Sequence, residues 1–189
     1  MRVLVTSSRN TFALDIVRKL GSTGHYVVAS DTYAGAIGNH SKYVSGHEVT
    51  ASPRFDTNQF IADINDIVAR HNIDVIIPSF EEAFYLSARA GDLPEGVTLF
   101  TGEFEQLARL HDKASFQRLV EQAGVPIPET VVVNSAEELQ AAIDRFPRFF
   151  ARAAFSRGGV GLLTNTGPLA GKMEVSDAQP TPDQPWLVQ

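Results

Sequence analysis

The sequence contains no cysteine among its 189 residues, and no apolar run approaches the roughly 20 residues that cross a bilayer. The missing cysteines exclude disulfides, thiolate catalysis and cysteine-ligated metals. The apolar run after Arg2 is too short for a signal peptide. We therefore expect a cytoplasmic protein with no membrane segment. No metal site is expected on these residues, because the histidines show no ligand spacing (His25, His40, His47, His71 and His111).

Positive charge is also scarce. Sixteen Lys and Arg stand against 22 Asp and Glu, which gives a net charge of −6. A general nucleic-acid binder needs clustered cations that release counterions, and no basic stripe is present. Any anion site must therefore be local, made from a few cations and backbone amides. With 43% hydrophobic residues the chain can bury the core of one large domain or two small ones.

The first hundred residues alternate between strand and helix patterns. Residues 2–6 and 25–30 are apolar strands, and residues 12–20 between them have helical apolar spacing. Further strands are predicted at 73–78 and 97–101, with a possible edge strand at 43–49. This order predicts an α/β fold with a parallel, Rossmann-like sheet.

The first turn after residue 6 lacks glycine, which argues against a dinucleotide-binding oxidoreductase. Such proteins need a G-x-G-x-x-G turn there, and the turn reads TSSRNTFA instead. In a dinucleotide-binding protein, Asp31 would be the acid that binds the ribose. Ser7 and Ser8 can still hold a small anion together with the helix N-terminus, although simple helix capping needs no ligand.

Two acids, Glu81 and Glu82, follow the strand at 73–78. Open α/β sheets bind ligands at the carboxyl ends of their strands, so both residues are candidate substrate contacts, suited to an ammonium group. The alternative is that acids in a first helical turn only complement the helix dipole.

From residue 103 the pattern changes. Short helices are predicted at 104–110 and 114–123, followed by the rigid connector GVPIP, a strand at 130–133 and a helix opened by a capping box at Ser135. We place the domain boundary near residue 111, giving domains 1–111 and 112–189. The closing segment PWLVQ has the pattern of a strand, which must either pair with another strand or remain an exposed edge.

Residues 149–163, FFARAAFSRGGVGLL, predict a β-hairpin with a glycine-rich tip at 156–161. Glycine allows backbone amides to approach a bound group closely, and Arg152 would place a positive charge beside them. Amides with a nearby cation are a common way to hold phosphate. Serine and glycine are also ordinary turn residues, and an arginine on a strand commonly faces solvent.

In this order and spacing, Asp112–Lys113, the GVPIP connector, the FFARAAFSRGGVG hairpin and PWLVQ resemble the front half of an ATP-grasp domain. The preceding sheet region resembles the pre-ATP-grasp domain of carbamoyl-phosphate-synthase-like ligases. The resemblance spans the whole chain and implies a Rossmann-like pre-ATP-grasp domain followed by a small α+β lobe.

The resemblance assigns candidate ATP contacts. Lys113 matches the first ATP-contacting cation, and Arg152 stands where the family has a strand lysine, commonly followed by proline. This chain has Arg152–Ala153 instead, and the larger, forked guanidinium changes the phosphate geometry. Gln189 matches the start of the adenine-binding hinge. The flap over the phosphates is matched by Ser156, Gly158, Gly159 and Gly161.

The resemblance also implies the chemistry: ATP phosphorylates a carboxylate, and an amine or similar nucleophile attacks the acyl phosphate. Ser7, Ser8, Glu81 and Glu82 are the candidates for the non-nucleotide substrate. In the family the Mg²⁺ ligands lie on a second lobe after the hinge, and this sequence stops at Gln189, before that lobe. We therefore expect weak or no ATP binding, and no turnover, from this chain alone.

Two classes of function stay open. The chain is either part of an ATP-dependent ligase, or a non-catalytic or split-subunit module that binds a small molecule and needs a partner lobe. A partner chain would supply that lobe in the second case, and a homo-oligomer is the other assembly left open. Self-association through an exposed edge at Trp186–Val188 would favour an incomplete lobe.

Overall fold

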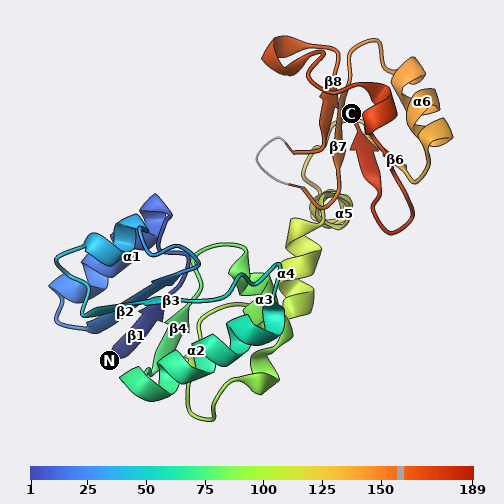
Figure 1. Ribbon diagram of the computed structural model, residues 1–189. Helices are drawn as coiled ribbons and strands as arrows, with labels where there is room; N and C mark the ends of the chain where they lie inside the picture. The colour runs from blue at the N-terminus through green and yellow to red at the C-terminus, as the bar shows by residue number, and fades with distance from the viewer. Residues whose placement is uncertain (157–159) are drawn as a thin grey trace. The chain divides into compact units, whose positions relative to one another are not determined.

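The computed structural model describes residues 1–156 and 160–189, and the chain divides into two compact units, Met1–Glu105 and Gln106–Gln189 (Figure 1). The division falls at the start of helix α4 (Phe104–His111). The sequence analysis places the boundary near residue 111, at the end of the same helix. Helix α4 includes both positions, so the predicted domain limits, 1–111 and 112–189, stay a prediction.

The first unit is built on a five-stranded parallel sheet. Its strands are β1 (Arg2–Val5), β2 (Tyr26–Asp31), β3 (Gly46–Val49), β4 (Val75–Ile77) and β5 (Thr98–Leu99). They lie in the order β3-β2-β1-β4-β5, with β3 and β5 at the edges. The predicted α/β class and parallel sheet are confirmed. The strand order reverses between β1 and β4, and in such sheets ligands bind at the carboxyl ends of the two strands that flank the reversal.

Helices cover both faces of this sheet, because side chains alternate along each strand. Val3 and Val5 of β1 pack with Ala13 and Val17 of α1 (Thr11–Ser22). Leu4 points to the opposite face, against α2 (Thr57–His71) and α3 (Glu82–Ala88). Two 3₁₀ segments, η1 (Ile37–His40) and η2 (Ala90–Asp92), complete the unit.

The second unit pairs helices with a four-stranded antiparallel sheet of order β6-β9-β7-β8. After α4 come α5 (Lys113–Gln122), β6 (Val131–Val133), α6 (Ala136–Arg145), β7 (Phe150–Ala153), β8 (Leu162–Thr164), η3 (Gly167–Leu169), η4 (Val175–Asp177) and β9 (Trp186–Val188). The predicted hairpin is confirmed as β7 and β8, with Arg152 opposite Leu162. The sheet and α6 share one core around Leu139, Ala151 and Val188.

The last strand, β9, is internal. It pairs with β6 on one side and β7 on the other, and its three residues are 5%, 1% and 0% exposed. Of the two alternatives for Trp186–Val188, pairing and an exposed edge, the structure shows pairing, so this strand offers no edge for self-association. The pairing is non-local, because Trp186–Val188 lies between strands that begin at residues 131 and 150.

Candidate functional site

A cavity of about 300 Å³ in the second unit brings together residues from α5, β7 and the end of β9. Its lining consists of Lys113, Phe116, Gln117, Val120, Ile127, Pro128, Arg152 and Gln189. Three of these, Lys113, Arg152 and Gln189, are predicted ATP contacts that lie far apart in the sequence. Among the described residues that line the cavity, none is acidic.

Lys113 is the first residue of α5. Asp112 caps this helix, since its carboxylate accepts hydrogen bonds from the amides of Ala114 (3.1 Å) and Ser115 (3.3 Å). The Lys113 ammonium donates to the carbonyl oxygen of Ala154 at 3.0 Å and also to that of Ser156. The lysine therefore ties the start of α5 to the segment that enters the predicted flap.

Arg152 lies in β7 between Leu162 of β8 and Leu187 of β9. Its guanidinium carbon is 5.9 Å from the centre of the Phe150 ring, and its buried Nε has no hydrogen-bond partner among the described residues. Native proteins rarely leave a buried donor unpaired, and a charged one is costly to leave so. This nitrogen therefore needs an acceptor from outside the described chain.

The two cations also affect one another. Burial lowers the pKa of the Lys113 ammonium, the charge of Arg152 lowers it further, and Asp112 opposes both effects. A group carrying several negative oxygens would relieve the repulsion between the two cations and supply the missing acceptor.

The other wall of the cavity is apolar, made by Phe116, Val120, Ile127 and Pro128. Beside it, the Gln189 amide donates to Thr130 Oγ1 at 2.9 Å and to Gln117 Oε1 at 3.3 Å. The sequence analysis missed Gln117. It stands four residues after Lys113 on one helix, a spacing that places both on the same face and offered a signal.

The predicted flap is only partly within the described residues. Ser156 is half-buried, and its hydroxyl donates to the carbonyl oxygen of Ala153 at 2.8 Å. Gly161 has φ +64°, and a Cβ there would lie 3.2 Å from that of Ala153, so glycine suits both the turn and the close approach. Gly158 and Gly159 lie outside the described residues.

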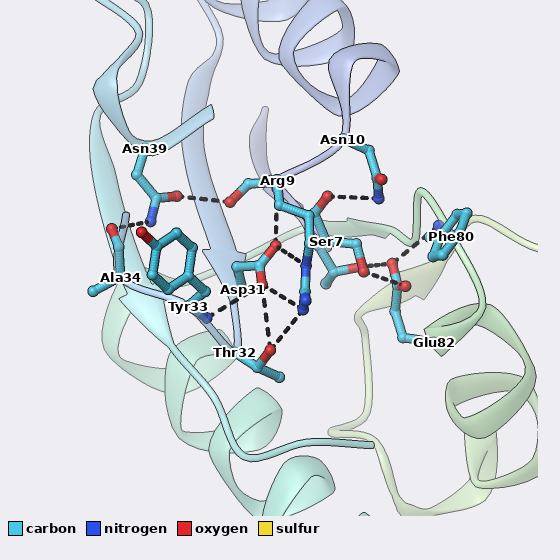
Figure 2. A network of polar contacts seen from close by, with 12 residues as sticks. Ser7, Arg9, Asn10, Asp31, Thr32, Tyr33, Ala34, Asn39, Phe80 and Glu82 are labelled. Carbon is cyan, nitrogen blue, oxygen red and sulfur yellow. Dashed lines mark hydrogen bonds and ion pairs between the residues drawn. The ribbon is translucent and has the colours of Figure 1, made fainter. Parts of the chain in front are cut away.

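The second candidate site lies at the carboxyl ends of β1 and β4 (Figure 2). Glu82 is 4% exposed there, and its carboxylate accepts from the hydroxyls of Thr6 and Ser7 and from the amides of Ser79 (2.9 Å) and Phe80 (3.2 Å). Four donors engage this carboxylate, so Glu82 holds the two loops together.

The other predicted substrate contacts differ in their surroundings. Ser7 reaches Glu82 from a backbone with φ +53°, a conformation that is strained for a residue with a Cβ. Ser8 points elsewhere, since its buried hydroxyl donates to Asn39 Oδ1 at 2.7 Å. Glu81 is half-buried at the N-cap position of α3, and its side chain makes no capping hydrogen bond.

Asp31, the acid that a dinucleotide site would use, is engaged within the protein. Its buried carboxylate pairs with the Arg9 guanidinium at 2.6 Å and accepts from the amides of Arg9 (2.8 Å) and Tyr33 (3.2 Å). Figure 2 shows this network beside Ser7. The adjoining cavity holds only about 30 Å³, too little for a nucleotide.

Within the part of the chain that the structure describes, no three His, Asp or Glu side chains cluster closely enough to hold a metal ion. In the same residues, no helix combines the length and the apolar content that a bilayer crossing requires.

No protein-family model matches the chain. Similar solved structures include biotin carboxylase from Campylobacter jejuni in a β,γ-ATP complex (TM-score 0.72, 15% identity, 98% of this chain and 44% of that one). Another is the biotin carboxylase domain dimer of Hydrogenobacter thermophilus 2-oxoglutarate carboxylase, with MgADP, ADP and bicarbonate (TM-score 0.71, 16% identity, 98% of this chain and 43% of that one). A third is N5-carboxyaminoimidazole synthetase from Staphylococcus aureus with ADP (TM-score 0.69, 13% identity, 100% of this chain and 46% of that one). This chain thus spans less than half the length of each, and the similarity at these identities establishes a shared fold.

Proposed function

We propose that this chain, which has the fold of the front half of an ATP-grasp protein, binds ATP in the cavity of its second unit. It would do so as the nucleotide-binding part of a ligase that activates a carboxylate as an acyl phosphate for attack by an amine. The observation that carries the proposal is the convergence of Lys113, Arg152 and Gln189 on one cavity with an apolar wall.

The cavity has the right division of chemistry for a nucleotide. Lys113 and Arg152 offer two cations, and the Arg152 Nε, unpaired among the described residues, is a free donor, which suits phosphate oxygens. Ile127, Pro128 and Gln189 offer an apolar surface and a polar group, which suit a planar base. Phosphoryl transfer depends mainly on positioning and charge neutralisation, and these residues would supply part of both.

Magnesium is the cofactor that the proposal requires, and the residues of this chain do not fit it. The described cavity lining holds no carboxylate, whereas Mg²⁺ prefers oxygen ligands from Asp and Glu. We assign the Mg²⁺ ligands to the second ATP-grasp lobe and derive no step through the ion from the present residues. The proposal therefore includes weak ATP binding and no turnover by these 189 residues alone.

In the same proposal, the non-nucleotide substrate binds at the carboxyl ends of β1 and β4, outside the cavity there, which at about 30 Å³ is too small to enclose it. This is the position at which open α/β sheets bind ligands. The proposed contacts are Ser7, Ser8, Glu81 and Glu82. Hydrogen bonds of Glu82 with Thr6, Ser7 and Ser79, and of Ser8 with Asn39, hold the loops that carry them.

Substitution of Arg152 tests the ATP site. We expect millimolar ATP and tripolyphosphate to perturb the amide NMR signals of α5 and β7 in the 189-residue chain. Arg152→Ala should weaken both ligands about tenfold, because a charge-assisted hydrogen bond is lost, and should not unfold the protein.

Arg148→Ala is the matched control, since Arg148 is an exposed arginine of the same unit outside the cavity. If Arg152→Ala lowers stability and leaves ligand affinity alone, Arg152 has a structural role and the phosphate site is wrong.

A further inference from the structure

The edge strand β6 of the second unit borders an open groove. Among the described residues, β6 pairs with β9 on one side and with no strand on the other. A groove of about 410 Å³ lies between this strand and α6. The helix lines the groove with four positions spaced i, i+3, i+4 and i+7 along one face: Glu138, Ala141, Ala142 and Arg145.

The backbone of Val132, the central residue of β6, faces the free edge. Gln189, which directly follows β9, exchanges both backbone hydrogen bonds with Phe150, at 2.9 and 3.1 Å. Hydrogen-bonding direction alternates along an antiparallel strand, so Leu187, two residues earlier, also faces β7. Val132 lies opposite Leu187, and its N–H and C=O groups therefore point away from β9.

This free edge is short and unprotected. The next outward-facing amide, that of Asn134, donates to Glu138 Oε2 at 2.7 Å and is already used. The strand consists of three valines in continuous register with β9, without the lysine, proline or bulge by which exposed edges resist pairing. The edge therefore centres on Val132, which offers one donor, one acceptor and a side chain that is 43% exposed.

A second copy of the same edge has the complementary pattern. Opposite residues of an antiparallel pair can exchange both backbone hydrogen bonds, so Val132 of one copy can bond Val132 of another about a two-fold axis. Such a contact closes on itself as a dimer. Strands in a sheet lie about 4.8 Å apart. Because α6 contacts both β6 and β9, the two α6 helices would lie about 10 Å apart, a separation at which helices pack.

The charges of α6 are complementary about the same axis. The helix runs antiparallel to β6, since Glu138 lies at the end of this strand and Arg145 pairs with Glu129 before its start. The axis through Val132 therefore passes near Ala141, whose small side chain permits a close approach. It brings Glu138 of each copy opposite Arg145 of the other. The Arg145–Glu129 pair is about 60% exposed at both ends and contributes little, so Arg145 is available to a second carboxylate.

We propose that the second unit self-associates through β6 and α6, as a two-fold dimer that joins two four-stranded sheets. Two backbone hydrogen bonds, the exposed Val132 side chains and two ion pairs would hold it. The contact is small, so the dimer is weak. It is independent of the ATP site, because the groove and the nucleotide cavity share no lining residue.

Sedimentation velocity of the 189-residue chain, from micromolar to millimolar concentration, tests the dimer. We expect a monomer–dimer equilibrium that salt weakens, because ions screen the two charge pairs. Val132→Pro should weaken the dimer at least about tenfold, since proline lacks the N–H group, and an edge strand tolerates proline where that group faces solvent. Val132→Thr keeps the N–H group and should retain the dimer.

Exchange of charges tests the orientation of the two copies. Arg145→Glu and Glu138→Lys should each weaken the homodimer at least about tenfold, because like charges then face one another across the axis. A mixture of the two variants should associate again as a heterodimer, because each copy then meets opposite charges. A purely structural role of either residue gives no such rescue. Asp144→Lys, at an exposed position of α6 outside the groove, is the control and should leave the dimer intact.

Each contrary result has a defined meaning. A chain that stays monomeric at millimolar concentration overturns the proposal, even if a synthetic peptide of residues 129–135 binds it, since the occupant is then another strand. A dimer that persists in Val132→Pro and in both charge variants uses another surface, which also overturns it. If Val132→Pro unfolds, the mixing experiment decides. ATP affinity should be equal in the Val132→Thr and Asp144→Lys chains and in the unaltered chain, so either proposal can fail alone.

Discussion

The two cations of the cavity occupy different environments. The Lys113 ammonium is held by the carbonyl oxygens of Ala154 and Ser156, whereas the buried Nε of Arg152 has no partner among the described residues. Both side chains line the same cavity, Lys113 from the start of α5 and Arg152 from a strand position between Leu162 and Leu187.

Burial and the positive charge of Arg152 lower the pKa of Lys113 from its ordinary value of 10.5. Arg152→Gln should raise that pKa toward 10.5, because it removes a like charge. A pH titration of the lysine side-chain NMR signals measures the change. Arg148→Gln, at an exposed position, should leave it as it is, and an unaltered pKa in Arg152→Gln would show that the two cations do not interact.

The sign of the associated stability effect follows from linkage. Between the lowered pKa and 10.5, the unfolded chain binds a proton at Lys113 that the folded chain has released. Stability therefore rises with pH across this interval. In Arg152→Gln the rise should be smaller, and urea denaturation at a series of alkaline pH values measures it.

Among the elements of the first unit, the edge strand β3 is tied to the end of α2 by charge. Glu48 makes a two-pronged ion pair with Arg70 (2.8 and 3.1 Å), and His71 Nε2 lies 2.7 Å from the same carboxylate. The hydrogen bond from Arg70 is the main cause that holds the pKa of Glu48 below its ordinary 4.5. An edge strand with charged side chains is also protected against pairing with other chains.

We expect this link to contribute stability above about pH 4.5 and to lose it as the pH falls through the lowered pKa of Glu48. Glu48→Gln should lower the free energy of unfolding by less than about 1 kcal/mol at neutral pH, because the ion pair is partly exposed. In acid the substitution should leave the free energy of unfolding unchanged. Urea denaturation at neutral and acid pH measures it, with exposed Glu95→Gln as the control. A cost that persists undiminished in acid would contradict the electrostatic explanation.

At the scale of the whole molecule, the two units have separate hydrophobic cores. Leu4, Ile64 and Ile76 belong to a cluster within Met1–Glu105, whereas Leu139, Leu163 and Val188 belong to one within Gln106–Gln189. Each unit also has its own cavity, that of about 30 Å³ beside Ser7 in the first and that of about 300 Å³ beside Arg152 in the second.

We therefore predict that core substitutions act on one unit only. Ile76→Ala should destabilise the first unit by about 2–5 kcal/mol, because it leaves a cavity among fully buried residues. Amide hydrogen exchange should accelerate throughout residues 1–105 and stay unchanged in the second unit. Leu163→Ala should produce the reverse pattern, and acceleration of both units by either substitution would show that they unfold together.

Local patterns in the sequence were sufficient for most elements. Helix α6 begins where Ser135 accepts from the Glu138 amide at 3.2 Å, as the predicted capping box requires, although the Glu138 carboxylate bonds the Asn134 amide rather than that of Ser135. The parallel sheet and the β7–β8 hairpin were likewise predicted from the sequence. Caps, turns and side-chain periodicity act within a few residues, so the sequence carries them directly.

Pairings between distant residues were decided only by the tertiary structure. Three features each join segments more than 30 residues apart: the place of β9 between β6 and β7, the engagement of Glu82 by Thr6 and Ser7, and the link from Gln189 to Gln117. The sequence by itself determined which residue types were present and which elements they form. Which of them share a cavity, and which are consumed by internal hydrogen bonds, depends on packing across the fold, because burial and hydrogen bonding are properties of the assembled neighbours.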